Sequence, residues 1–312
     1  MESFILSFEA VTPIFLLMLL GYFLKKTKIA DKKMFDGINR LVFKVFLPML
    51  LFYNIYKTQI FQEFDVRLIA FTLTTVLCVF VLGMASVFFI TKDNSKRGVI
   101  LQGFFRSNYA ILGIPFINYV CGEEAGGISS LMVAFVVPFF NVLAVIALET
   151  FNGGKIDFKK IFKGVLTNPL IIGCICGIAF KLLGIKLPKV IEVSIADASK
   201  IASPLAILVL GATFSFSGIR GYFKENVIVA VTRLIIVPFI ALFAALNLGF
   251  TGEAFACLII VFGSPVAVSS FAMAQQMGGD ENLAGQLVVV TSALCVLTLF
   301  MWVYIFSSIG VI

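Results

Sequence analysis

Histidine is absent from this 312-residue sequence, and only 13% of its residues are charged. A chain without imidazole has no histidine metal ligand, no Ser/His/Asp triad and no histidine proton relay. The six cysteines form no CxxC pair and lie in or at the ends of apolar segments, where they are typical of small packing residues. These absences argue against a metal cofactor and against triad-type catalysis.

Apolar residues dominate the chain instead, since 60% of the residues are hydrophobic and the mean hydropathy is +1.07. Such a composition is too apolar for a soluble fold of this length, so we expect lipid to surround the protein. The net charge of +7 does not indicate a nucleic-acid partner, because the basic residues form short clusters between apolar runs. The first apolar run starts at Phe4, contains Glu9 and continues to Leu24, which predicts a retained helix rather than a cleaved signal peptide.

Ten apolar runs are long enough to cross a bilayer, which takes about 20 residues per helix. We predict an all-α integral membrane protein with ten transmembrane helices, at 4–24, 34–56, 67–91, 98–120, 127–150, 162–183, 196–217, 226–249, 253–277 and 284–309. One set of alternate loops carries 14 lysines and arginines and the other carries 6. Positive loops stay in the cytoplasm, so we predict that both termini lie outside a bacterial cytoplasmic membrane.

The two halves of the sequence repeat each other. A shift of 156 residues places Pro13 on Pro169, Lys44 on Lys200 and Pro48 on Pro204, and a shift of 157 places Phe105 on Phe262 and Ser107 on Ser264. Matched prolines and lysines across half a chain are not easily accidental. Each half holds five predicted helices, so residues 1–156 and 157–312 are predicted to be two inverted five-helix repeats, a plan typical of secondary transporters.

Two predicted helices, the fourth and the ninth, are interrupted at matching places. Segment 103–122 reads GFFRSNYAILGIPFINYVCG, and segment 262–279 reads FGSPVAVSSFAMAQQMGG. At membrane depth, non-helical backbone is tolerated only where it lines a cavity or is covered by protein, and the N-termini of the half-helices then favour an anion. We predict broken crossing helices that meet near the membrane midplane. The alternative is that Pro115 and Pro265 only kink their helices.

Polar residues beside these breaks are candidate substrate ligands. Asn108 can donate an amide hydrogen bond to a carboxylate, or it can hold two helices together. Arg106 can give a cavity positive potential, or its guanidinium can reach out to the membrane surface. The other candidates around the two breaks are Ser107, Gly113, Pro115, Ser264, Pro265 and Gln275.

Other ionisable residues also fall within predicted helices. Lys44 and Lys200 are repeat partners, and each precedes a proline by four residues. If they face the protein interior, they can pair with carboxylates such as Glu9 or Asp197; otherwise they extend to the membrane surface. A proton-coupling role for either carboxylate is a further alternative.

With these residues laid out, the sequence resembles the auxin efflux carrier family, which includes bacterial permeases and plant auxin exporters. The likeness runs over nearly the whole length. It rests on TPIFLLMLLGY from Thr12, GINR at Gly37–Arg40, FLPMLLF around Pro48, NYAILGIP at Asn108–Pro115 and the dipeptide Ser264–Pro265.

This resemblance implies an NhaA-like fold. Helices 1, 2, 6 and 7 would form a scaffold domain that often dimerises, and helices 3–5 and 8–10 would form a transport domain. It also implies that Asn108 and the crossover backbone coordinate a substrate carboxylate, with Leu47 facing the site from the scaffold. The sequence departs from the plant members at Ser107, where they have proline, and at Thr72 and Val76, where they have an acid and a lysine. These departures argue against auxin itself as the substrate.

We therefore predict a secondary transporter that moves a small organic carboxylate by an elevator mechanism, and neither an enzyme nor a cofactor-binding protein. The expected partners are the carboxylate, the lipid bilayer, a coupling proton or sodium ion, and a second copy of the chain bound through the scaffold. The alternative is a sodium-coupled organic-anion symporter of the bile-acid symporter type. A channel is less suitable, because the predicted helices show broken segments rather than a ring of like charges.

Overall fold

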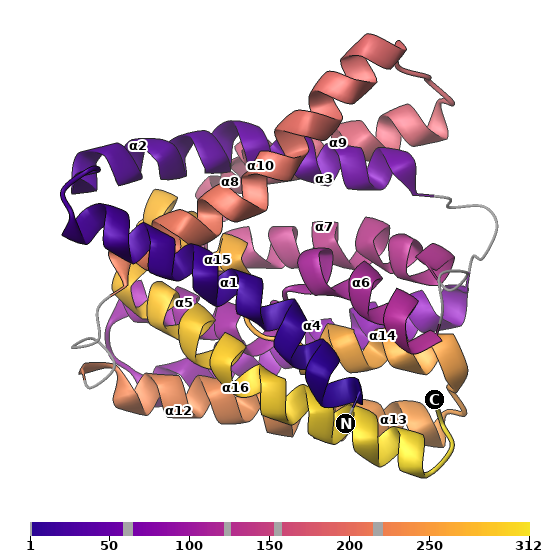
Figure 1. Cartoon of the computed structure of the whole chain (residues 1–312). Coiled ribbons are helices and arrows are strands. Elements are labelled where there is room, and N and C mark those ends of the chain that lie inside the picture. The colour runs from indigo at the N-terminus through magenta and orange to yellow at the C-terminus, as the bar shows by residue number, and fades with distance from the viewer. Residues whose placement is uncertain (1, 59–64, 122–125, 153–157, 215–220) are drawn as a thin grey trace.

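The computed structural model describes residues 2–58, 65–121, 126–152, 158–214 and 221–312. Every regular element within these ranges is a helix, and strand-like pairing there is limited to an isolated bridge between Ser107 and Val266. The helices form two groups, whose members are labelled in Figure 1.

The first group contains α10 and the helices that pack on it, and we call it the α10 group. Its members are α1 (Glu2–Lys26), α2 (Lys32–Leu41), α3 (Leu47–Lys57), α8 (Phe158–Thr167), α9 (Pro169–Leu182) and α10 (Lys189–Thr213). Helix α1 packs along α10, and α3 packs against both α9 and α10. Glycines permit this close approach, because a methyl group added at Gly211 would lie 2.0 Å from the Met18 carbonyl oxygen.

The second group contains the remaining helices, and we call it the crossing group. Its members are α4 (Val66–Ile90), α5 (Asn94–Phe105), α6 (Tyr109–Cys121), α7 (Gly126–Phe151), α12 (Phe223–Val231), α13 (Val237–Asn247), α14 (Gly252–Gly263), α15 (Val268–Gln276) and α16 (Glu281–Ser308). Helix α5 packs against α4 and α7, and α14 packs against α6 and α13. The two interrupted pairs, α5–α6 and α14–α15, are therefore enclosed by the long helices of this group.

Two long helices contain a short π-helical turn, and each turn is followed by a proline. Val42–Phe46 joins α2 to α3 before Pro48, and Thr232–Ile236 joins α12 to α13 before Pro238. Proline has no N–H and its ring crowds the carbonyl four residues earlier, so the helix widens locally rather than ending. The Leu234 carbonyl, which loses its helical donor to Pro238, accepts a hydrogen bond of 2.9 Å from Trp302 Nε1.

Side-chain caps fix where several helices begin. Asp31, Asp65, Asp93, Asn168 and Asp280 each precede a helix, and each accepts a hydrogen bond from a backbone N–H in its first turn. An N-cap of this kind satisfies a donor that the helix itself leaves open, which is worth about 1 kcal/mol. These boundaries are therefore encoded locally.

Six helices of the described ranges are long and apolar enough to cross a membrane: Lys32–Lys57, Val66–Ile90, Leu131–Phe151, Lys189–Thr213, Phe223–Asn247 and Glu281–Ser308. A seventh is reached if α8 and α9, which bend by 56° at their junction, count as one span. Helices α5, α6, α14 and α15 have only 12, 13, 12 and 9 residues, so none of them crosses alone. The protein is an all-helical, multi-pass membrane protein, and its arrangement as ten inverted spans stays a prediction.

Candidate binding site where two broken helices cross

The two interrupted helices meet at their breaks. Helix α5 ends at Phe105 and α14 ends at Gly263, and the short extended segments that follow them pair as antiparallel backbone at Ser107 and Val266. The Asn108 N–H donates to the Pro265 carbonyl at 2.9 Å, and the Ala267 N–H donates to the Arg106 carbonyl at 3.4 Å. Each break therefore satisfies part of the other's backbone, as burial in an apolar environment requires.

Local chemistry explains why both helices stop at this level. Pro265 lacks an N–H and disfavours helical geometry at Ser264, so α14 ends immediately before this dipeptide. The first break contains no proline; there the Ser107 hydroxyl accepts from the Tyr109 N–H at 3.2 Å, which competes with helical bonding. In the second break, the Val266 N–H donates to Thr291 Oγ1 of α16 at 3.1 Å.

A small cavity of about 40 Å³ lies beside the crossing, with room for only a few water molecules. Its polar lining consists of Arg106, Ser107, Asn108, Asn141, Ser203 and Ser269. Both helix groups contribute apolar walls: Leu47, Leu50, Leu51, Leu170 and Ala206 come from the α10 group, and Val137, Phe140, Ala267 and Val268 come from the crossing group or its second break. The cavity is therefore a junction between the two groups.

Arg106 is buried beside this cavity, with only 3% of its surface exposed. Its Nη1 donates to Gln102 Oε1 at 3.0 Å and to Met273 Sδ at 2.6 Å. Its Nη2 donates to Asn141 Oδ1 at 2.6 Å and to Ser269 Oγ at 3.0 Å. All four partners are neutral side chains, and none of the ion pairs among the described residues includes Arg106. The guanidinium thus brings an uncompensated positive charge to the cavity wall.

Asn108 is also buried at 3% exposure, and its side chain lines the cavity. Its backbone is occupied on both sides, since the carbonyl accepts from the Leu112 N–H at 3.1 Å and the N–H pairs with Pro265. The side-chain Nδ2 has no hydrogen-bond partner among the described residues. Buried amides are normally bonded, so this open donor marks a place for an acceptor that enters the cavity.

A second buried arginine, Arg233, lies behind the crossing in the π-helical turn between α12 and α13, and it is fully buried. All the hydrogen bonds that its guanidinium makes with described residues go to backbone oxygens. Nε donates to the Ser264 carbonyl at 3.0 Å, Nη2 to the Val261 carbonyl at 2.7 Å, and Nη1 to the Phe105 carbonyl at 3.2 Å. Arg233 therefore ties the C-terminal ends of α5 and α14 together.

The structure brings four of the predicted site residues to the cavity: Leu47, Arg106, Ser107 and Asn108. Ser264 and Pro265 lie in the second break and meet Arg233 and Asn108 through their carbonyls, and neither lines the cavity. Gly113 is buried one turn further along α6, with the Tyr109 ring 2.9 Å from where its methyl group would be. Pro115 lies within α6, and its side chain falls outside the described residues.

Gln275 lies at the other end of α15, where it connects the two helix groups. Its Nε2 donates to Asp36 Oδ1 at 3.0 Å, and its Oε1 accepts from Asn39 Nδ2. Both partners belong to α2. Nearby, Lys32 and Glu281 form an ion pair of 3.7 Å between the same groups. Gln275 is thus a contact between the groups and does not line the cavity.

Three further ionisable residues of the predicted spans, Lys44, Asp197 and Lys200, take surface positions. Lys200 pairs with Asp197 at 2.9 Å, but the two side chains are 74% and 65% exposed, so the pair does not face the protein interior. Lys44 is exposed as well, and the Glu9 side chain lies outside the described residues. These charges therefore lie away from the cavity.

Asn141, Ser203 and Ser269 belong to the cavity lining although the sequence analysis did not select them. Asn141 interrupts the long apolar helix α7, and a polar residue at such a position is a functional candidate by default. That signal could have identified Asn141. Serines are common as packing residues in membrane helices, so nothing in the sequence marks Ser203 or Ser269.

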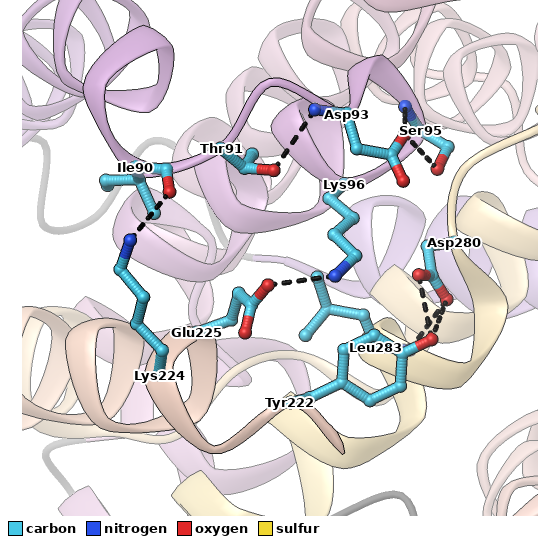
Figure 2. A network of polar contacts seen from close by, with 10 residues as sticks. All are labelled: Ile90, Thr91, Asp93, Ser95, Lys96, Tyr222, Lys224, Glu225, Asp280 and Leu283. Atoms are coloured by element: carbon cyan, nitrogen blue, oxygen red, sulfur yellow. Dashed lines mark hydrogen bonds and ion pairs between the residues drawn. The ribbon is translucent and has the colours of Figure 1, made fainter.

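A network of polar contacts lies at one end of the crossing group, where the α4–α5 turn meets the start of α12 and of α16 (Figure 2). Lys96 and Glu225 form an ion pair of 2.9 Å, and Lys96 Nζ lies 4.8 Å from the centre of the Tyr222 ring. The Tyr222 hydroxyl donates to Asp280 at 3.0 Å, and burial together with Asp280 raises the pKa of Tyr222 to about 12. This network joins the ends of four helices, α4, α5, α12 and α16, and is separate from the cavity lining.

Comparison with known proteins gives one consistent result. The family model described as membrane transport protein matches residues 6–160 and 155–303, which is nearly the whole chain. A transporter of Methanothermobacter thermautotrophicus is 25% identical over 303 residues, covering 95% of this chain and 97% of its own. Transporter MJ1031 of Methanocaldococcus jannaschii is 24% identical, with 95% and 98% covered, and YfdV of Escherichia coli is 22% identical, with 94% and 95% covered. The chain therefore belongs to the membrane transport protein family, the auxin efflux carrier family.

Proposed function

We propose that this chain is a secondary transporter of a small organic carboxylate, and not an enzyme. The observation that carries the proposal is that two polar side chains, those of Asn108 and Arg106, line the same buried cavity. Asn108 offers an amide donor that has no partner among the described residues, and Arg106 offers a guanidinium whose partners are all neutral. No acid among the described residues lines the cavity. A carboxylate entering it would satisfy the amide and neutralise the charge.

The energetics favour an anion over a neutral ligand. A hydrogen bond to a charged group contributes about 1.5–3 kcal/mol, roughly twice the contribution of a neutral pair. The Arg106 guanidinium is already buried without a counter-ion, so it is already desolvated before the anion arrives. Substrate binding therefore gains the attraction without the full penalty of burying both charges.

Helix orientation adds to the positive potential. The N-termini of α6 and α15 both begin at the breaks, next to Asn108 and Val268, which line the cavity. The N-terminus of a helix carries a partial positive charge of about half an elementary unit. Two such ends beside a guanidinium attract an anion and repel a cation.

The ten-span inverted arrangement is part of the proposal, and the helix boundaries support it. A shift of 156 residues moves Lys32–Lys57 to 188–213, where α10 runs from Lys189 to Thr213. A shift of 157 residues moves α4 (Val66–Ile90) to 223–247, the bounds of the joined α12–α13 helix. The same shift moves the break at 106–108 to 263–265, which overlaps the second break at 264–267. We accordingly divide the chain at residues 156 and 157.

Transport would occur by movement of the crossing group past the α10 group, which would act as the scaffold. The cavity lies between the two groups and holds only a few water molecules, so a carboxylate enters only if the groups shift. The contacts of Gln275 with Asp36 and Asn39 would have to break during this movement. We propose that this structure represents a closed state of an elevator cycle.

The scaffold would also carry the contact with a second copy of the chain. Lys44, Asp197 and Lys200 are exposed on helices of the α10 group that are long enough to span a membrane. Charges at such depth are unfavourable toward lipid, so a protein partner would stabilise this face. We propose a homodimer in a bacterial cytoplasmic membrane with both termini outside, the orientation that the loop charges favour.

The substrate site can be tested with purified protein and a panel of mono- and dicarboxylates. A ligand that binds the folded state raises the melting temperature, so the panel first identifies a substrate by thermal shift. Uptake of that substrate is then measured in proteoliposomes. We expect Asn108→Ala to weaken affinity about 10-fold, since one hydrogen bond to an anion is lost. Asn108→Asp should abolish binding, because a second carboxylate would repel the substrate.

Asn226→Ala is the matched control, because Asn226 is another buried asparagine of the crossing group whose side chain has no partner among the described residues. It does not line the cavity. Its replacement should leave carboxylate affinity unchanged. Unchanged binding and transport in Asn108→Ala would remove the site assignment, whatever the behaviour of the control.

A further inference from the structure

We propose that Arg233 is a positioning residue that acts as a permanent internal cation and holds the two broken helices together, so that the crossing needs no bound alkali cation. This proposal rests on the proposed transport function only for the role that Arg233 has during a transport cycle. Its physical content concerns two backbone segments, the ends of α5 and α14, that meet at one guanidinium.

The oxygens that surround Arg233 all come from helix ends. Phe105 is the last residue of α5, Val261 lies in the last turn of α14, and Ser264 follows its end. The last four carbonyls of a helix have no partner within that helix. Here they lie in the protein interior, where an unsatisfied carbonyl is unfavourable by several kcal/mol in an apolar medium. The three closest hydrogen bonds of Arg233, from 2.7 to 3.2 Å, satisfy buried carbonyls at the ends of both helices.

The charges balance without an acid. The C-terminus of a helix carries about half a negative elementary charge, so two converging ends supply about one. Arg233 supplies one positive charge at the same point, and none of the ion pairs among the described residues includes it. The guanidinium is therefore compensated by helix dipoles rather than by a carboxylate.

Backbone carbonyls are also the ligands with which proteins bind alkali cations. At this crossing those positions are filled by guanidinium nitrogens. Arginine stays protonated at every physiological pH and cannot leave during a transport cycle. The two half-helices are thus held together in the empty and the loaded protein alike, which argues against a sodium ion as the element that completes the crossing.

The assignment also separates the two arginines near the breaks. Arg106 lines the cavity, whereas Arg233 does not. The donors of Arg233 bond to the C-terminal ends of α5 and α14, and the cavity lies at the N-terminal ends of α6 and α15. Substrate can bind and leave at the N-termini of α6 and α15 while Arg233 keeps the C-termini of α5 and α14 fixed. The crossing can then move as one unit without releasing or taking up a metal ion.

Chemical rescue provides the test, with the melting temperature of the purified protein as readout. Arg233→Ala should lower the melting temperature by about 10 °C, because several buried carbonyls lose their donors. Millimolar methylguanidinium should restore part of that loss by filling the vacated position. Arg233→Lys should lose less than Arg233→Ala, because the ammonium keeps the charge and donates to fewer carbonyls.

Arg67→Ala is the control, because Arg67 also donates to a backbone carbonyl, that of Leu248, but from an exposed position over the Phe250 ring. Methylguanidinium should not stabilise this variant or the unmodified protein. The unmodified protein should also melt at the same temperature in sodium chloride and in choline chloride of equal ionic strength.

Two results would overturn the proposal. One is a saturable rise of the melting temperature of the unmodified protein with sodium, a measurement that does not depend on any variant folding. The other is a folded Arg233→Ala protein that methylguanidinium does not stabilise. Neither readout involves a carboxylate, so failure here is distinct from failure of the proposed substrate site, which shows only in the carboxylate panel.

Discussion

Arg106 and Arg233 are both buried beside the same crossing, yet they differ in the partners that hold them. Arg106 donates to four side chains from three helices, namely Gln102, Asn141, Ser269 and Met273. Arg233 donates to backbone carbonyls at the ends of α5 and α14. Side-chain partners can be replaced by mutation, whereas carbonyl partners are present whatever the sequence.

This difference suggests that the two arginines have different roles. A guanidinium held by carbonyls depends only on the path of the backbone, so it suits a permanent structural role. A guanidinium held by neutral side chains at a cavity keeps its charge available to a ligand, and its position can be tuned by the residues around it. The comparison predicts that disturbing Arg106 affects recognition and that disturbing Arg233 affects stability.

Among the changes that separate the two arginines, the largest effect on recognition is expected for Arg106→Met. This change keeps an unbranched apolar stem and removes the charge, so carboxylate affinity should fall about 30-fold, corresponding to about 2 kcal/mol for a charged hydrogen bond. The melting temperature should stay level or rise, because a buried charge without a counter-ion is unfavourable. Isothermal titration with the carboxylate and thermal melts of the same sample separate the two quantities.

Arg233→Met supplies the contrast for that experiment. Its melting temperature should fall sharply, while carboxylate affinity, measured well below the melting transition, should change little. If both variants lost affinity to the same extent and kept their stability, the division between the two arginines would be wrong.

A smaller effect is expected when Arg106 stays and loses a side-chain partner. Asn141→Leu removes the acceptor that lies 2.6 Å from Nη2, so the guanidinium should shift within the cavity wall. We expect about a 10-fold loss of affinity. Ser269→Ala removes a 3.0 Å partner of the same nitrogen and should weaken binding less. Competition binding against one labelled carboxylate ranks the two, and an unaffected Asn141→Leu protein would show that Arg106 needs no positioning from α7.

The same contrast explains how much of the site could be foreseen. The interruptions around Asn108 and Pro265 were visible in the sequence, because Gly, Ser, Asn and Pro within apolar runs disrupt helices for local reasons. Arg106 and Asn108 could be selected as polar residues next to such a break. The number of long helices was less predictable. Ten spans were predicted, but the interrupted helices are too short to cross a membrane alone, and α8 and α9 are bent at their junction.

Long-range neighbours were beyond the sequence. Gln275 lies seven residues beyond the start of α15, about 10 Å along the helix axis, and there it meets α2 rather than the cavity. The carbonyl partners of Arg233 come from two segments that are distant from it in the sequence. Neither contact follows from helical periodicity, because both depend on how the two groups pack.

A third prediction tests whether the second break is held by a side chain as Arg106 is. Thr291→Val keeps the shape of the side chain and removes the acceptor of the Val266 N–H, which would leave a buried donor unsatisfied. We expect a loss of about 1–2 kcal/mol, or a few degrees in melting temperature. Thr298→Val on the same helix is the control, since its hydroxyl bonds only within α16. Equal melting temperatures for the two variants would show that Thr291 does not support the break.

The smallest effect is expected from charges that are paired at one end of the crossing group, in contrast to both buried arginines. Lys96 and Glu225 form an ion pair of 2.9 Å within the network of Figure 2. Their side chains are 22% and 12% exposed, so water and salt screen part of the attraction. A double-mutant cycle of Lys96→Met and Glu225→Gln should give a coupling of about 0.5 kcal/mol. The coupling should shrink at high salt, whereas the melting temperature difference between Arg233→Met and the unmodified protein should not. A coupling as large as the Arg233 effect would mean that exposure does not set the strength of these contacts.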